Sequence, residues 1–151
     1  MTKRREFIRQ SVLGTAGIAI GGIGLSARSY GSVVGSNERI NVTVVGLRSR
    51  GTAHIEEWCY LKDSHNTRLV SLCDADEQFF AERMKTVEEK TGMKPTVDSD
   101  LRKVLENKDI HVVSFATPNH WHALGTIWAC QAGKHVYVEK PACHNILREG
   151  K

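Results

Sequence analysis

Strand-like and helix-like segments alternate along most of this chain, and that alternation restricts the possible folds more than any other feature. The strand-like runs, rich in β-branched and other apolar residues, are Ile40–Gly46, Arg68–Asp74, Thr96–Asp98, Ile110–Thr117 and His135–Lys140. The helix candidates between them, marked by apolar spacing or a terminal glycine, are Gly51–Leu61, Asp76–Lys90, Asp100–Asn107 and Asn119–Ala132. This order predicts an α/β fold, a doubly wound parallel sheet with helices on both faces.

The edge at which these strands end is where we expect the chemistry. Ligands of parallel sheets bind at the carboxyl ends of the strands. The residues that end the longer runs are Gly46, Asp74, Thr117 and Lys140. They should therefore line one crevice.

Residues 1–30 have the layout of an export signal. Two adjacent arginines, Arg4 and Arg5, precede Phe7, and an apolar, glycine-rich run follows over Ser11–Ala27. The arginine pair is typical of a twin-arginine signal, which predicts an exported, periplasmic protein. The alternative is an uncleaved segment that anchors the protein, although the run is shorter than the ~20 apolar residues of a stable membrane span.

Length, charge and cysteine spacing exclude several classes of protein. The 151 residues include 21 Lys and Arg against 17 Asp and Glu, and part of this excess lies in the signal segment. No clustered basic face remains to predict a nucleic-acid partner. No C-x-x-C pair occurs, and the histidines have no other ligand type at suitable spacing, so no metal site is predicted. We assign residues 31–38 to a linker and residues 39–151 to one domain.

The turn after the first strand carries a dinucleotide-binding fingerprint. The stretch from Gly46 to Gly51 follows G-x-G-x-x-G, except that Arg48 replaces the second glycine. Gly46 would permit the tight turn, and Gly51 the close packing of helix on strand. Backbone N–H groups of this loop would face a pyrophosphate, which makes Leu47, Arg48 and Arg50 candidate cofactor contacts. The Arg48 side chain would either crowd the phosphates or pair with them.

Asp74 ends the second strand, roughly 20 residues beyond the fingerprint, where such domains place the acid that binds the adenosine ribose. A carboxylate there accepts hydrogen bonds from the ribose hydroxyls and repels a 2′-phosphate, so NAD is favoured over NADP. The alternative is a helix N-cap, for which Asp74 and Asp76 are equally suited.

Two further stretches resemble a known family. "ATPNHWHA" begins at Ala116 and "AGKHVYVEKP" at Ala132. Together they resemble the P-N-x-x-H, A-G-K-H-V and E-K-P motifs of the Gfo/Idh/MocA oxidoreductases, including the signal-bearing members. The resemblance extends from Ile40 to the end of the chain. It implies a Rossmann-type NAD(P)-binding domain that uses NAD.

The resemblance also implies roles for single residues. Those that match the family's cofactor loop are Thr117, Pro118, Asn119 and His122. Glu139 matches a residue that helps to hold the nicotinamide ribose. Lys140 matches the active-site lysine, which contacts the reacting hydroxyl and assists proton transfer. The bond before Pro141 is expected to be cis, as in the family.

The implied reaction moves a hydride between a sugar- or cyclitol-like carbinol and NAD. In this family a second, α+β domain that binds the substrate follows the E-K-P strand. We therefore expect an incomplete Rossmann sheet without that domain, inactive alone and able to pair as a homo-oligomer. The alternatives are a non-catalytic NAD-binding module or fragment, and an NAD-dependent glycoside hydrolase of the same fold.

Overall fold

The computed structural model describes residues 39–143. Its strands are β1 (Ile40–Val45), β2 (Thr67–Cys73), β3 (Thr96–Asp98), β4 (Val112–Phe115) and β5 (His135–Val138). Its helices are α3 (Ser49–Tyr60), α4 (Phe80–Thr91), α5 (Leu101–Glu106) and α6 (Asn119–Gln131), with a 3-10 turn, η1 (Glu77–Phe79), before α4. The predicted signal, 1–30, and the predicted linker, 31–38, lie outside the described residues, as do residues 144–151.

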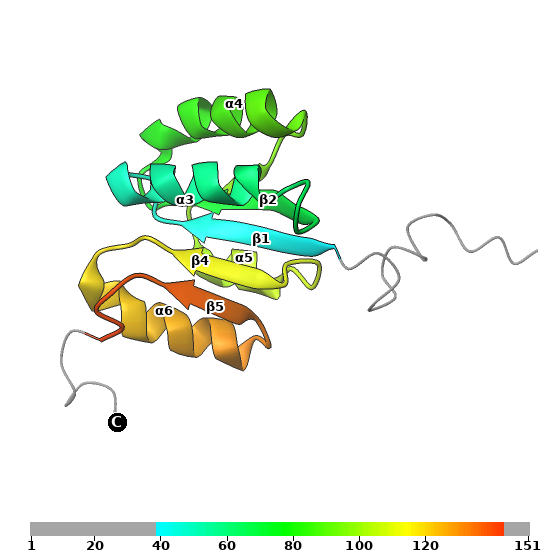
Figure 1. Cartoon of the computed structure of the whole chain (residues 1–151). Helices are drawn as coiled ribbons and strands as arrows, with labels where there is room; N and C mark the ends of the chain where they lie inside the picture. The colour runs from blue at the N-terminus through cyan, green and yellow to red at the C-terminus, as the bar shows by residue number, and fades with distance from the viewer. Residues whose placement is uncertain (1–38, 144–151) are drawn as a thin grey trace, which may run out of the picture. The chain divides into compact units, whose positions relative to one another are not determined.

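The five strands form one parallel sheet in the order β3-β2-β1-β4-β5 (Figure 1). The described chain begins at the central strand β1, proceeds outward to β3, and then crosses back to β4 on the other side of β1. The reversal between β1 and β4 is the topological switch point, where such sheets bind their ligands. The predicted Rossmann-type, doubly wound fold is confirmed.

Each face of the sheet carries its own apolar core because successive strand residues point to opposite faces. Val44 belongs to the core under α3 and α4, together with Ile55 and Val87. Val45 belongs to the core under α5 and α6, together with Phe115. No helix of the described residues is long and apolar enough to cross a membrane.

The strands end earlier than the apolar runs predict. β2, β4 and β5 end at Cys73, Phe115 and Val138, so the residues predicted to close these strands lie in the loops that follow. The predicted helix from Asp76 is preceded by η1, because the Asp76 side chain accepts a hydrogen bond from Gln78 N and begins a short turn there. The loops after the strands, and not the strands themselves, therefore carry the candidate site.

Candidate functional site

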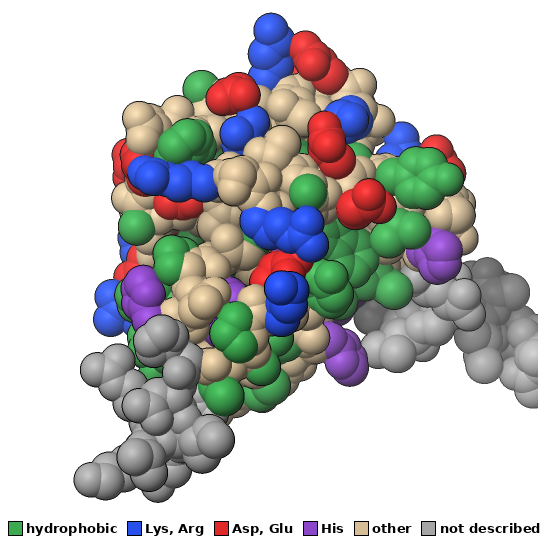
Figure 2. Space-filling view, turned by 60° about the vertical axis from the view of Figure 1, so that its left-hand side comes forward, with side chains coloured by type: hydrophobic (Ala, Val, Ile, Leu, Met, Phe, Trp, Pro, Cys, Tyr) green, Lys and Arg blue, Asp and Glu red, His purple; other side chains and the backbone are tan. Residues whose placement is uncertain are grey.

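The loops at the carboxyl edge of the sheet enclose two adjoining cavities. The larger, of about 960 Å³, is lined by Gly46, Asp74 and Thr117, and the smaller, of about 430 Å³, by Thr117 and Lys140. Both include Ala116 and Thr117 in their walls. Figure 2 shows this edge of the molecule, where basic and acidic side chains lie beside exposed hydrophobic ones. The four predicted strand-end residues thus lie at one edge of the sheet, but they line two adjoining cavities and not a single crevice.

Two positions of the glycine loop leave no room for a side chain. A Cβ on Gly46 would lie 2.8 Å from the backbone carbonyl of Ala116, and Gly46 has a φ of +88°. A Cβ on Gly51 would lie 1.9 Å from the Gly46 carbonyl oxygen. The first glycine therefore allows β1 to turn tightly beside β4, and the last allows α3 to start against that turn.

The N-terminus of α3 points its backbone N–H groups into this region. Its N-cap residue, Arg48, makes no side-chain hydrogen bond to the helix, and the first turn contains no acidic residue. Uncapped N–H groups and the helix dipole favour an anion at such a position. The loop thus has the donor set that a diphosphate requires.

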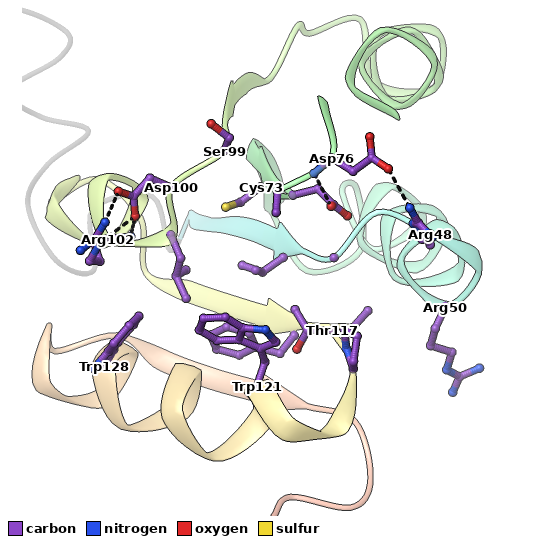
Figure 3. Close-up of a pocket in the computed structure, with 18 of the residues that line it drawn as sticks. Arg48, Arg50, Cys73, Asp76, Ser99, Asp100, Arg102, Thr117, Trp121 and Trp128 are labelled. Atoms are coloured by element: carbon purple, nitrogen blue, oxygen red, sulfur yellow. Dashed lines mark hydrogen bonds and ion pairs between the residues drawn. The ribbon is translucent and has the colours of Figure 1, made fainter. Parts of the chain in front are cut away.

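The Arg48 side chain lines the larger cavity and is bonded to the loop after β2. Its Nη2 lies 2.7 Å from Asp76 Oδ2 (Figure 3). Its guanidinium lies 5.0 Å from the centre of the Phe79 ring. The guanidinium beside Asp76 lowers the pKa of that carboxyl. In this arrangement the side chain is directed toward the loop after β2, in the wall of the cavity that Gly46 also lines.

Asp74 holds the glycine loop by a hydrogen bond. Leu47 N donates to its Oδ2 at 2.7 Å, and Asp76 N donates to its Oδ1 at 2.9 Å. The sequence left open whether Asp74 or Asp76 acts as a helix N-cap. In the structure Asp76 is the N-cap of η1. Each Asp74 oxygen accepts a single N–H, and a carboxylate has about four acceptor positions. Asp74 therefore retains acceptor capacity toward the larger cavity, which it lines.

The loop after β4 is joined to the loop after β5 by His122. This residue is 1% exposed, and its Nε2 and Nδ1 lie 2.8 Å and 2.7 Å from the carbonyl oxygens of Thr117 and Pro141. Both oxygens are acceptors. The ring therefore donates to both of them only when both nitrogens are protonated, and to one of them in either neutral tautomer. His122 reaches the smaller cavity with both ring nitrogens engaged. Pro118 and Asn119 begin α6 beside it, and Asn119 lines the same cavity.

Glu139 is held by two residues of α3. Arg50 Nε donates to its Oε1 at 2.6 Å, and His54 Nε2 lies 3.1 Å from the same oxygen. His54, followed by Arg50, lowers the pKa of the Glu139 carboxyl to about 2. Neither His54 nor its other partner, Ser114, belongs to a motif found in the sequence. The sequence feature that could have indicated this contact is the position of His54 on the buried face of α3, beside Gly51 and Ile55.

Lys140 follows Glu139 at the wall of the smaller cavity and is exposed. The Lys140–Pro141 bond is cis, as expected. Two indole rings on α6, those of Trp121 and Trp128, lie 6.4 Å apart and line the larger cavity (Figure 3). The structure thus brings every predicted strand-end residue to one of the two cavities, and adds the tryptophans as a wall that the sequence motifs do not mark.

Known proteins are similar to this chain over most of its length. A family model described as "Oxidoreductase family, NAD-binding Rossmann fold" matches residues 40–149. "Glycosyl hydrolase family 109 protein 1" of Shewanella sp. (strain ANA-3) is 29% identical over 155 aligned residues, which cover 91% of this chain and 33% of the relative. An alpha-N-acetylgalactosaminidase of Shewanella oneidensis has the same identity and coverage. The chain thus spans about a third of the length of these curated relatives.

Solved structures agree with these matches. A levoglucosan dehydrogenase in complex with NADH and levoglucosan is 30% identical, with a TM-score of 0.61 over 70% of this chain and 28% of that protein. The apo scyllo-inositol dehydrogenase of Lactobacillus casei, 23% identical, shares the fold with a TM-score of 0.60 over 74% of this chain and 31% of its own.

Proposed function

The chain belongs to the Gfo/Idh/MocA oxidoreductase family, and we propose that it forms the cofactor-binding part of an exported enzyme that acts on sugar- or cyclitol-like carbinols. It folds as the NAD-binding Rossmann domain of that family, with NAD as the cofactor. The observation that carries the proposal is the convergence of the glycine loop, the Asp74 carboxylate and the Lys140 ammonium at one edge of the sheet.

The residues at this edge fit a dinucleotide. The uncapped N–H groups of α3 would bind the diphosphate, and Asp74 would accept from the adenosine ribose hydroxyls. Glu139, in the wall of the smaller cavity, would accept from the second ribose. When bound, NAD supplies a hydride acceptor. The protein's own part is to hold the two ends of the dinucleotide in the two cavities.

Lys140 is the residue that we assign to the chemistry. Its ammonium lines the smaller cavity, carries three donors and is exposed, so a substrate hydroxyl can reach it. As an ammonium, a lysine in that position donates a hydrogen bond to a carbinol oxygen; taking up the carbinol proton would require its neutral amine form.

A glycoside hydrolase is the second candidate, and the curated relatives favour it. They include a glycosyl hydrolase family 109 protein and an alpha-N-acetylgalactosaminidase. Assays of the chain with NAD separate the alternatives. Net formation of reduced cofactor from a sugar or cyclitol supports the dehydrogenase. Release of nitrophenol from a nitrophenyl α-N-acetylgalactosaminide without net reduction supports the hydrolase. NAD binding with neither reaction is expected both of a non-catalytic module and of a cofactor-binding domain that is inactive alone.

Cofactor preference tests the assignment of Asp74. Calorimetric titration should show NAD binding at least tenfold tighter than NADP, a difference of about 1.4 kcal/mol, because the carboxylate repels a 2′-phosphate. Asp74→Ala should narrow the ratio to about threefold or less. Asp74→Asn, which keeps an acceptor for the Leu47 N–H, separates loss of charge from loss of the loop contact. Asp63→Ala, beyond the far end of α3, is the control. Tighter NADP binding by the wild type would assign control of this end to Arg48 or Arg50.

We also propose that residues 1–30 direct export by the twin-arginine route. The Arg4–Arg5 pair and the apolar run support it. A reporter fused to residues 1–36 should reach the periplasm, and Arg4→Lys with Arg5→Lys should reduce its export at least tenfold, whereas Lys3→Arg should not. Undiminished export of the double variant would contradict this route. A reporter retained in the membrane fraction would favour the uncleaved anchor.

A further inference from the structure

A buried histidine outside every sequence motif, His54, connects α3 to the residue that precedes the catalytic lysine. It is 6% exposed. Its Nδ1 lies 3.0 Å from Ser114 Oγ, and its Nε2 lies 3.1 Å from Glu139 Oε1. The Tyr137 ring, whose centre is 5.3 Å away, packs against it. Ser114 and Tyr137 are paired across β4 and β5, so they present their side chains to His54 from one face of the sheet.

The partners of His54 determine which nitrogen carries its proton. A carboxylate only accepts hydrogen bonds, so Nε2 must donate to Glu139. In the neutral ring Nδ1 is then an acceptor, and the Ser114 hydroxyl donates to it. Both contacts are satisfied by the Nε2–H tautomer without a charge on the ring. The ring is thereby fixed in orientation by β4 and in turn directs a donor at Glu139.

A Ser–His–Glu arrangement invites comparison with hydrolase triads, but the serine excludes that role. The Ser114 side chain is 0% exposed and lies within β4, between β1 and β5. No substrate can reach its hydroxyl, so it cannot act as a nucleophile. In a hydrolase triad the carboxylate orients the histidine, and the histidine activates the serine. Here the serine orients the histidine, and the histidine orients the carboxylate.

We propose that His54 is a positioning residue that fixes Glu139 through one oxygen, Oε1, and so leaves Oε2 for a hydroxyl of the ligand in the smaller cavity. Arg50 donates to the same Oε1, and within the described part of the chain no donor is bonded to Oε2. Glu139 lines that cavity beside Lys140. The inference rests on the proposed function, because the hydroxyl is taken to be that of the nicotinamide-side ribose.

His54 has the greater part in this positioning because it is buried. The Arg50 side chain is 64% exposed, and an exposed ion pair holds a long side chain only weakly. The His54 side chain has only two torsions, and Ser114 and Tyr137 contact its ring. Its Nε2–H is therefore held in a single orientation, toward Glu139.

Two matched variants separate the contacts of the ring. The imidazole Nδ1 is two bonds from Cβ, as is the amide nitrogen of asparagine, whereas Nε2 is three bonds away, as is the amide nitrogen of glutamine. His54→Asn therefore keeps the contact with Ser114 and loses the one with Glu139, and His54→Gln keeps a donor for Glu139. Calorimetry with NAD and with ADP, which lacks the second ribose, isolates the contribution of Glu139. NMR titration of the Glu139 carboxyl reports its surroundings directly.

His54→Asn should weaken NAD binding about three- to tenfold and leave ADP binding unchanged, and the Glu139 titration midpoint should rise from about 2. His54→Gln should keep most of the wild-type NAD affinity and a Glu139 titration midpoint close to that of the wild type. If His54→Asn leaves the NAD-to-ADP ratio and the midpoint as in the wild type, the inference is wrong. If the wild type binds NAD no more tightly than ADP, and Glu139→Ala changes neither, the assignment of the smaller cavity to the second ribose fails. The carboxyl titration alone then decides whether His54 positions Glu139.

Discussion

Replacing Gly46 with alanine should destabilise the domain by about 2–5 kcal/mol and abolish measurable NAD binding. Two separate costs contribute. An L-residue at a φ of +88° costs about 1–2 kcal/mol. The added Cβ would also lie 2.8 Å from the Ala116 backbone, and overpacking of this kind costs about 1–3 kcal/mol. Since small domains unfold with about 5–15 kcal/mol, the loss is a large part of the total.

Gly92→Ala provides a matched control for this substitution. Gly92 also has a positive φ, +72°, but nothing lies within 4 Å of its added Cβ. It should cost about 1–2 kcal/mol and leave NAD affinity unchanged. Urea unfolding followed by circular dichroism, with calorimetry of NAD binding, measures both effects. Equal losses in the two variants would mean that backbone conformation alone, and not the approach of β1 to β4, explains the glycine.

Local patterns were sufficient to predict the fold and the edge that carries the site. The runs at Ile40 and Ile110 are apolar enough to predict buried strands, and Gly92 marks the end of α4 in the left-handed conformation. The alternating order of strands and helices then predicts a doubly wound parallel sheet. Glu139 and Lys140 were located by family resemblance, because a charged pair after a strand has no local signal of function.

Contacts between distant residues could not be predicted in this way. His54 and Glu139 are 85 positions apart, and Arg48 and Asp76 are 28 apart. Which side chains meet depends on strand register and on where each strand ends. The apolar pattern places those ends imprecisely, because it continues into the loops beyond β2, β4 and β5. Arg48 illustrates the consequence: no pattern in the sequence indicates that the loop after β2 supplies both a carboxylate and an aromatic ring for its guanidinium.

The contact that joins the two loops at the smaller cavity should be the second most sensitive point of the domain. His122→Phe keeps a ring of similar size but removes both nitrogens, so the N–H that a neutral ring donates to the Thr117 or the Pro141 carbonyl is lost. An unsatisfied, partly buried carbonyl costs about 1–3 kcal/mol, and we expect a total loss of about 2–4 kcal/mol. With the loops released from each other, NAD affinity should fall more than ADP affinity, since the smaller cavity lies between them.

His120→Phe is the control for that substitution, because it lies on the same helix two residues earlier and is exposed. A surface change of this kind should alter stability by no more than about 0.5 kcal/mol. Urea unfolding of both variants measures the cost of the buried contact, and titration with NAD and ADP measures its effect on the site. If His122→Phe is as stable as His120→Phe, the loops are held by other means. If it is less stable but keeps the wild-type ratio of NAD to ADP affinity, the histidine supports the fold of α6 and not the geometry of the cavity.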